Sequence, residues 1–279
     1  MKKNLLLLAA LSMAFTGAAP AQMPKTVKVA IEGAFPPWNA LDSSGKLEGF
    51  DVDLISWLCR RAAVECQLSS GAWATLVPGL NLGKYDVVMT LGINEKRKKV
   101  VDFTLPYASG VASFLVLKNS DLAGLPMTGQ RLNLNDKARA DGVMAAIGQK
   151  LKGKTVGVVQ STSQEQLMNS YFGDSVKVRT YRSSAERDLD IKAGRIDAGF
   201  DSGVYARFIM SKAGNQDLTN AGPDLKGSVL ATDVAMGMRK GEADLKARFD
   251  GAIKAAAAEG VIRQLSEKWS KLDLTPDYP

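Results

Sequence analysis

The chain has 279 residues, of which 36 are Lys or Arg and 29 are Asp or Glu, and it contains no histidine. The lack of histidine excludes Ser-His-Asp and Cys-His catalysis, histidine-ligated metal sites and the usual proton shuttle at neutral pH. The net charge of +7 is spread along the chain without the clustered basic and aromatic residues that nucleic-acid binding needs, so we expect no nucleic-acid partner.

The first 21 residues have the pattern of a secretory signal peptide. Lys2 and Lys3 form a basic start, an apolar run extends from Leu5 to Phe15, and Ala19 to Ala21 form an A-x-A cleavage site. The apolar run is too short for a membrane span, and no cysteine follows the cleavage site to carry a lipid. We therefore expect cleavage after Ala21 and a soluble periplasmic or secreted product.

The mature chain is long enough for two lobes. Removal of residues 1–21 leaves 258 residues, more than a typical single hydrophobic core requires. Because Lys2 and Lys3 are lost, 34 basic residues remain against 29 acidic ones, and the net charge becomes +5. A solvated surface explains this mild basic excess.

Short β-branched runs alternate with helical patterns along the mature chain. A run at 26–32 precedes a helix expected at 51–63, and a run at 154–160 precedes a helix expected at 163–172. This alternation predicts the α/β class, with mostly parallel sheets covered by helices. Further strands are expected at 85–91, 112–118, 176–181, 196–202 and 234–240. Further helices are expected at 185–193, 203–213 and 244–269, the last divided at Gly260.

A polar stretch over residues 119–152 interrupts the alternation. Its pattern predicts a loop followed by a helix of its own, which makes it an insertion or an elaborated crossover. Its composition is too varied for a flexible linker. We therefore expect strands, rather than a linker, to join the two lobes.

Cys59 and Cys66 are the two cysteines of the chain. An oxidising compartment favours a disulfide between them, and two buried free thiols are the alternative. On one continuous helix, residues seven positions apart have Cα atoms about 10 Å from each other, which is beyond disulfide range. A disulfide therefore requires the helix expected at 51–63 to end between the two cysteines.

The sequence lacks the common motifs for nucleotide binding. It contains neither a Walker loop nor a G-x-G-x-x-G segment after a strand. Asp51 and Asp53 could suggest metal ligation, but both fall at the start of a predicted helix, where the helix dipole stabilises carboxylates. We interpret both as helix-start residues and expect no metal site and no cofactor.

The segment VVQSTSQE joins a strand to a helix through hydroxyl residues. Ser161 and Gln164, and likewise Thr162 and Glu165, have the spacing of a capping box. The free backbone N–H groups of such a helix start can bind a carboxylate. A helix cap without any ligand would also explain Thr162 or Ser163.

Arg97 and three aromatic residues are further candidates for a binding site. Arg97 belongs to a basic run that is typical of a solvated helix face, but an arginine near a strand end can bind a carboxylate through two parallel hydrogen bonds. Phe35, Trp38 and Trp73 are residue types that are more often found in the core. Trp73 nevertheless occupies a Gly/Ala/Ser-flanked segment that looks like a loop entering a helix, where its ring could stack on a ligand.

Several segments, taken in order, resemble one family of transport proteins. They are GKLEGFDVDL, LVPGL followed by GKYDVVM, EKRKKVVDFTLPY, LKGKTVGVVQSTSQE, AGRIDAGFDS and a late GMRKGEADLKARFDGAIKAAAAEGVIRQLSEKW. Over essentially the whole mature chain they resemble the periplasmic solute-binding proteins of polar amino-acid ABC transporters. Within that family, IEGAFPPWN and the 119–152 stretch look most like the octopine- and nopaline-binding members, which also carry Glu at this strand end and a similar insertion.

The resemblance implies the two-lobed type II fold of periplasmic binding proteins, an α/β fold that closes as a hinge on a ligand in the interlobe cleft. It places two hinge strands near 111–117 and 233–238. Lobe 1 would comprise residues 22–112 and 236–279, and lobe 2 residues 113–235. The implied partners are a small amino-acid-like ligand and an inner-membrane ABC permease. The protein is expected to be a monomer that performs no covalent chemistry.

The resemblance also implies roles for individual residues. Arg97 would bind the ligand α-carboxylate, assisted by the backbone at Gly92 and by the amide and hydroxyl of Thr162. Thr90 would lie beside the ligand amino group, and Glu32 would face its positive charge. The other implied binding residues are Phe35 and Trp73 beside the ligand side chain, Trp38 at the pocket rim, and Val159, Ser163, Gln164 and Ser202 on the lobe 2 side.

Two departures from the family pattern concern the ligand. Many members that bind free amino acids hold the α-ammonium with an Asp where this chain has Ser202, and Asp201 lies one residue earlier. The strand DVVMTLGI resembles the family pattern with one residue fewer, which leaves the roles of Thr90 and Gly92 open. Both departures suit an N-substituted amino acid with a secondary amine.

Three alternatives to an opine receptor stay open. One is a receptor for arginine, ornithine, lysine or histidine. Another is a periplasmic enzyme on the same fold, such as a cyclohexadienyl-type dehydratase, for which Glu32 is the only obvious acid/base candidate. The third is a signalling receptor domain, and the end of the sequence at Pro279 without a membrane span or output module counts against it.

Overall fold

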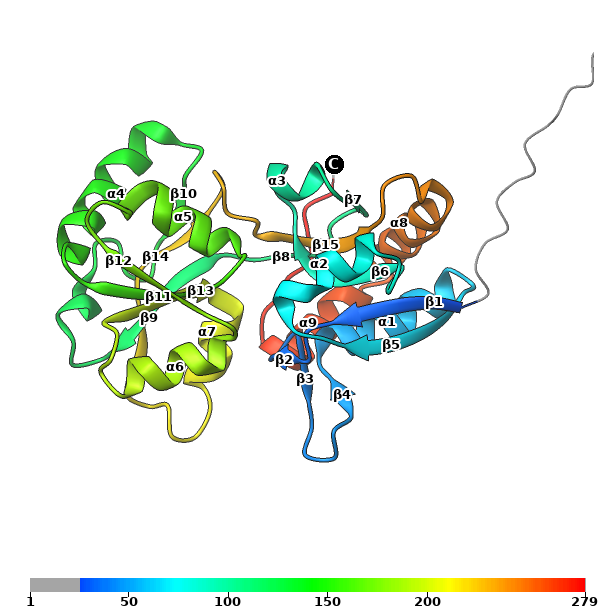
Figure 1. The fold of residues 1–279 in the computed structure, drawn as a ribbon, viewed down its shortest axis with the longest axis horizontal. Helices are drawn as coiled ribbons and strands as arrows, with labels where there is room; N and C mark the ends of the chain where they lie inside the picture. The colour runs from blue at the N-terminus through cyan, green and yellow to red at the C-terminus, as the bar shows by residue number, and fades with distance from the viewer. Residues whose placement is uncertain (1–25, 279) are drawn as a thin grey trace, which may run out of the picture.

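The computed structural model describes residues 26–278, so the expected signal peptide lies outside the described part of the chain. These residues form two lobes that lie side by side (Figure 1). Each lobe is built on one six-stranded sheet. Between residues 26 and 278 no helix is long and apolar enough to cross a membrane.

Lobe 1 contains the beginning and the end of the described chain. Its sheet has the order β5 (Glu65–Ser70), β1 (Thr26–Ile31), β6 (Val87–Gly92), β15 (Asp233–Met238) and β7 (Asp102–Phe103), with β8 (Ala108–Ser109) also paired to β15. Its helices are α1 (Phe50–Arg61), α2 (Trp73–Asn81), α3 (Glu95–Lys98), α8 (Ala243–Ala258) and α9 (Val261–Ser270). A small separate sheet consists of β2 (Ala34–Phe35), β3 (Asn39–Leu41) and β4 (Leu47–Glu48).

Lobe 2 is formed by the middle of the chain. Its sheet has the order β10 (Arg131–Asn133), β14 (Leu218–Lys226), β9 (Ala112–Leu117), β13 (Ala198–Ser202), β11 (Thr155–Val159) and β12 (Lys177–Tyr181). Its helices are α4 (Lys137–Leu151), α5 (Ser163–Phe172), α6 (Ser184–Lys192), α7 (Gly203–Met210) and the 3-10 helix η1 (Asp121–Gly124).

Each sheet is covered by helices on both faces. Successive side chains of its central strands point to opposite faces and pack into two different cores. In β1, Val29 and Ile31 pack into the core that contains residues of α1, α8 and α9, whereas Ala30 packs with residues of α2 on the other face. In β9, Phe114 belongs to the core with α4 and α5, and Leu115 to the core with α6 and α7. A strand buried on both faces has apolar residues at successive positions, which explains these runs.

Both sheets are mixed, whereas the alternating pattern predicted mostly parallel ones. β1 pairs in parallel with β5 and β6, and β11 with β12 and β13. β9 and β15 run antiparallel to their neighbours β13, β14 and β6. These two strands enter their sheets directly from the other lobe. They therefore begin at the edge where the parallel strands end, and no crossover helix reverses them.

The chain crosses between the lobes twice, at residues 110–111 and 227–232 (Figure 1). The two crossings are joined by a hydrogen bond from Gly110 N to Thr232 O, at 2.9 Å. The expected hinge strands 111–117 and 233–238 largely coincide with β9 and β15, which are each fully paired within one sheet. The short crossings before these strands have fewer partners, and the position of the hinge stays a prediction.

Cys59 in α1 and Cys66 in β5 form a disulfide with Cα atoms 6.1 Å apart. α1 ends at Arg61, so the helix ends between the two cysteines as expected. The stretch over 119–152 contains the expected helix, α4, and also η1 and β10. The three residues of β10 are too few to show a periodic pattern in the sequence.

Candidate functional site

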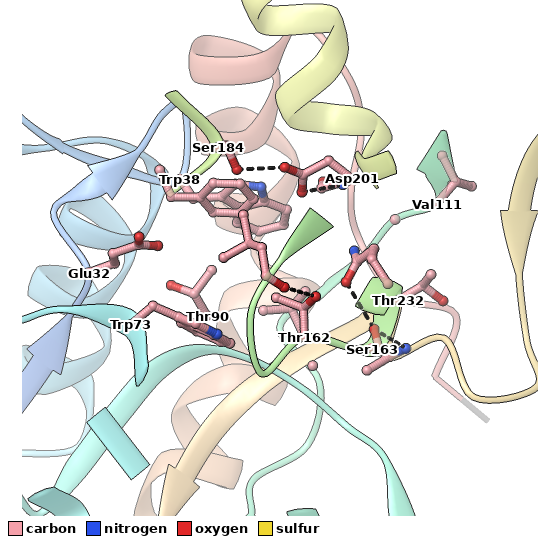
Figure 2. A pocket seen from close by; sticks show the side chains of 18 of the residues that line it. Glu32, Trp38, Trp73, Thr90, Val111, Thr162, Ser163, Ser184, Asp201 and Thr232 are labelled. Atoms are coloured by element: carbon pink, nitrogen blue, oxygen red, sulfur yellow. Dashed lines mark hydrogen bonds between the residues drawn. The ribbon is translucent and has the colours of Figure 1, made fainter. Parts of the chain in front are cut away.

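One cavity lies between the lobes, where parallel strands of both sheets end (Figure 2). β6, β11 and β13 each contribute residues to its wall, Glu32 directly follows β1, and β15 begins beside it. In open α/β sheets, ligands bind outside the carboxyl ends of the strands. All twelve residues proposed from the sequence line this cavity: Glu32, Phe35, Trp38, Trp73, Thr90, Gly92, Arg97, Val159, Thr162, Ser163, Gln164 and Ser202.

Seven further residues line the cavity and were not among those proposed. They are Gly110, Val111, Ser184, Asp201, Ala231, Thr232 and Val234. Gly110, Val111, Ala231 and Thr232 belong to the interlobe crossings, and Val234 is the second residue of β15. No local pattern marks these crossings as cavity wall, because their position depends on how the two lobes meet. Asp201 was noticeable in the sequence as the acid next to Ser202.

Arg97 is the cation of the cavity. The side chain of Asn94 caps α3 and accepts a hydrogen bond from Arg97 N at 2.8 Å, which holds the residue at the cleft. Its Nη1 donates to Gly92 O at 2.8 Å, and its Nη2 donates to Ser161 O of lobe 2 at 3.1 Å. Its guanidinium lies over the ring of Trp73, 5.2 Å from the centroid.

The charge of Arg97 is not neutralised by any carboxylate among residues 26–278. Burial alone lowers the pKa of Arg97 to about 10. Its current acceptors are two backbone carbonyls, which are weaker partners than a carboxylate. The arrangement therefore favours an anion in the cavity.

The start of α5 lies next to the cavity. Thr162 caps this helix, with Oγ1 accepting from Glu165 N at 3.2 Å, and Glu165 Oε2 accepts from Ser161 N at 2.7 Å. This confirms the expected cap by Thr162, whereas Glu165 accepts from Ser161 N rather than from Thr162 N, and Gln164 accepts from Ser163 Oγ at 3.2 Å. The first N–H groups of a helix have no acceptor within the helix and remain available to a ligand.

The Thr162 hydroxyl differs from its expected role. It donates its proton to Val159 O at 2.6 Å and so has no proton left for a ligand carboxylate. In this conformation the backbone amides of the first turn, rather than the hydroxyl, are the groups that can bind an anion. The expected contribution of the Thr162 backbone amide to carboxylate binding is compatible with the position of this helix start beside the cavity.

Two carboxylates face each other across the cavity, and only Glu32 is free of hydrogen bonds within the described chain. Asp201 accepts from Ser184 Oγ at 2.5 Å, from Ser202 N at 2.6 Å and from the guanidinium of Arg187. Burial, followed by the charge of Asp201, raises the pKa of Glu32 to about 7. A ligand cation next to Glu32 would favour its ionised form.

The three aromatic candidates have different positions. Phe35 stacks on Tyr205 of α7, with ring centroids 5.2 Å apart. The ring of Trp73 contacts the guanidinium of Arg97 and also forms part of the cavity wall. Trp38 is only 2% exposed and packs edge-on against Phe50, which places it in the inner wall rather than at the rim.

Asp51 and Asp53 fall in the first turn of α1, as expected, but this position does not explain the burial of Asp51. Asp53 accepts from Lys268 Nζ at 2.7 Å near the surface. Asp51 is fully buried and accepts from the hydroxyls of Thr90 and Tyr107 at 2.5 and 2.8 Å. No group of three or more potential metal ligands occurs in the described part of the chain.

The chain is similar to known proteins along nearly all of its length. The family model for bacterial extracellular solute-binding proteins, family 3, matches residues 27–272. The octopine-binding periplasmic protein of Rhizobium meliloti is 38% identical, covering 93% of this chain and 95% of that one. The L-arginine-binding protein of Pseudomonas aeruginosa is 30% identical, covering 98% of each chain.

The fold is also found among solved structures. An ancestral arginine-binding protein bound to arginine matches with a TM-score of 0.75 and 27% identity, covering 89% of this chain and 99% of that one. The family model and this likeness confirm the resemblance and the two-lobed α/β fold inferred from the sequence. The chain belongs to the bacterial extracellular solute-binding proteins, family 3.

Proposed function

We propose that this protein captures an amino acid or amino-acid derivative in the periplasm and delivers it to an ABC permease, and that its ligand is an opine similar to octopine. One observation carries the amino-acid part of the proposal. The same cavity contains Arg97, a cation without a carboxylate partner in the described chain, and Glu32, a carboxylate without a hydrogen bond there. A ligand with both an anionic and a cationic group complements both residues.

The opine part of the proposal is supported by the acceptors around the ligand amine. Ser202 occupies the place where many relatives have an Asp, and the neighbouring Asp201 already accepts from Ser184, Ser202 and Arg187. A protonated secondary amine has two N–H donors, whereas a primary ammonium has three. The secondary amine of an opine therefore leaves fewer donors unsatisfied here. The 38% identity with an octopine-binding protein points the same way.

A receptor for arginine or another basic amino acid is the second candidate, favoured by the 30% identity with an L-arginine-binding protein. Calorimetric titration with octopine, nopaline, arginine, ornithine, lysine, histidine and glutamate separates the two candidates. We expect an opine to bind most tightly. Much tighter binding of arginine than of every opine would reject the opine assignment and leave the amino-acid receptor.

Arg97→Ala tests the binding site itself. We expect this variant to lose most of its affinity for the tightest ligand, because breaking a buried ion pair costs about 3–5 kcal/mol. Arg60→Ala, at an exposed position of α1, is the matched control and should bind normally. Affinity of Arg97→Ala close to that of the control would reject the proposed role of Arg97.

Location and assembly are tested on the exported protein. We propose cleavage after Ala21, so mass spectrometry of the protein recovered from a periplasmic fraction should show Gln22 as the first residue. Light scattering after gel filtration should give the mass of one mature chain. A retained N-terminal segment or a stable dimer would contradict the respective proposal.

A further inference from the structure

Thr90 has an unusual backbone conformation at the cavity. It lies in β6 with φ of 60°, although β-branched residues rarely adopt positive φ. Such conformations are maintained by surrounding contacts and are frequent at functional sites. Three hydrogen bonds hold Thr90: its N donates to Tyr107 Oη at 2.8 Å, its Oγ1 donates to Asp51 at 2.5 Å, and Asn39 Nδ2 donates to Oγ1 at 3.0 Å.

The direction of these hydrogen bonds follows from Asn39. The amide oxygen of Asn39 accepts from Gly33 N at 2.7 Å, so its Nδ2 must face Asp51 and Thr90. Tyr107 Oη accepts from Thr90 N and donates to Asp51 Oδ1 at 2.8 Å. Asp51 therefore receives three hydrogen bonds from side chains and, as an ionised carboxylate, can only accept.

Burial raises the pKa of Asp51 to about 6, and hydrogen bonds from Thr90, Asn39 and Tyr107 oppose this rise. Asp51 is therefore mostly ionised at neutral pH. The Thr90 hydroxyl consequently gives its single proton to Asp51 and one lone pair to Asn39 Nδ2. What remains for the cavity is one lone pair.

We propose that Asp51 is a positioning residue that makes Thr90 an acceptor-only group of the binding site, so that the ligand must present a donor to it. This inference builds on the proposed function by adding a selection rule for the ligand. A protonated primary or secondary amine satisfies the rule. A carbonyl or carboxylate oxygen at the same place would face the Thr90 lone pair and be rejected.

The hydrogen bond itself is tested without any ligand. A threonine hydroxyl whose oxygen lies 2.5 Å from an oxygen of a buried carboxylate should exchange its proton slowly and give a downfield proton NMR resonance. We expect this resonance in the ligand-free protein and its loss in both Asp51→Asn and Thr90→Val. A wild-type protein without such a resonance, or a resonance that persists in Asp51→Asn, would overturn the proposal.

The effect on binding is tested by a double-mutant cycle with octopine and with arginine as probes. In Asp51→Asn one uncharged amide oxygen replaces the two acceptor oxygens that receive Thr90, Asn39 and Tyr107, so the Thr90 hydroxyl is held less firmly in one direction and affinity should fall about tenfold or more. In the Thr90→Val background the same Asp51→Asn change should have little further effect. Equal losses in both backgrounds would show that Asp51 acts only on the fold and would reject the positioning role.

Ligand chemistry provides a readout that does not depend on Asp51 variants folding. Wild type should prefer arginine to its 2-oxo analogue, which replaces the amine by a carbonyl, and Thr90→Val should reduce this preference about tenfold. An unchanged preference would reject the acceptor role of Thr90. If neither octopine nor arginine binds wild type while the hydroxyl resonance is present, the proposed function is rejected. The inference that the Thr90 hydroxyl donates its proton to Asp51 is then still supported.

Discussion

The ring of Phe35 in lobe 1 stacks on the ring of Tyr205 in lobe 2, with centroids 5.2 Å apart and an angle of 12° between the planes. Tyr205 Oη donates to Asp188 at 2.7 Å, and Asp188 accepts from the fully buried Arg187, which also pairs with Asp201 at the cavity. The contact between the lobes is thus supported by a buried ionic cluster. The two lobes are therefore in direct contact beside the cavity.

Phe35→Ala should weaken ligand binding, because the substitution removes the stacking contact with Tyr205 that joins the two lobes. An aromatic pair contributes about 0.5–1.5 kcal/mol beyond its buried area, so we expect a loss of about twofold to tenfold in octopine affinity, or in arginine affinity if that probe binds better. Calorimetric titration measures this loss of affinity. Leu189→Ala, at a side chain that is 64% exposed in α6, is the control. Equal affinities of the two variants would contradict a role for the stack in closure.

Gly92→Ala should obstruct the closed conformation. A Cβ at this position would lie 2.2 Å from Ala231 O, in the crossing whose Ala231 N donates to Ser163 Oγ at 3.1 Å. Only a displacement of the crossing relieves this overlap, and overpacking of this kind costs about 1–3 kcal/mol. We expect weaker ligand binding and, by small-angle scattering, a larger radius in saturating ligand.

The control for Gly92→Ala is Gly251→Ala in α8, where an added Cβ meets no atom within 4 Å. This control should bind ligand and compact normally. A Gly92→Ala variant that closes as fully as the control would show that the crossing can move without affecting the cleft.

Ligand affinity should depend on the ionisation of Glu32. Its pKa is raised to about 7, first by burial and then by the charge of Asp201, so Glu32 is mostly protonated at pH 6 and ionised at pH 8. Because the ionised form attracts a cation, affinity for arginine should rise from pH 6 to pH 8. Binding near pH 7 should release protons, which calorimetry in buffers of different ionisation enthalpy detects.

Glu32→Gln provides the control for this pH dependence. The variant cannot ionise, so both the rise in affinity and the proton release attributed to Glu32 should disappear. A wild-type affinity that stays constant between pH 6 and pH 8 would mean that no ligand cation lies near Glu32.

Removal of the disulfide should lower stability without changing the site. The Cys59–Cys66 bond closes a short loop, for which the chain-entropy relation gives about 2.5 kcal/mol. The double variant Cys59→Ser/Cys66→Ser should lose this amount in chemical denaturation and keep its ligand affinity, because neither cysteine lines the cavity. An unchanged free energy of unfolding would contradict the prediction.

Local sequence patterns were sufficient where one segment contains both the signal and its partners. α5 spans 163–172 as predicted, since its cap and its apolar positions lie within that segment. The break between α8 and α9 falls at Gly260, which has φ of 73°, a conformation that glycine adopts at little cost. The two- and three-residue strands β2, β3, β4, β7, β8 and β10 were not predicted, because such short strands show no period.

The ordered motifs of the chain resemble one family, and that resemblance supplied twelve residues that line the cavity. Only the tertiary structure decided how those residues are used. The hydroxyl of Thr90 reaches Asp51 across 39 positions of the chain, and Glu32 of lobe 1 lies close enough to Asp201 of lobe 2 for the charge of Asp201 to raise its pKa. Contacts of this kind join elements that lie far apart in the sequence. The polarity of Thr90, the pKa of Glu32 and the lack, among residues 26–278, of a carboxylate beside Arg97 therefore followed from packing.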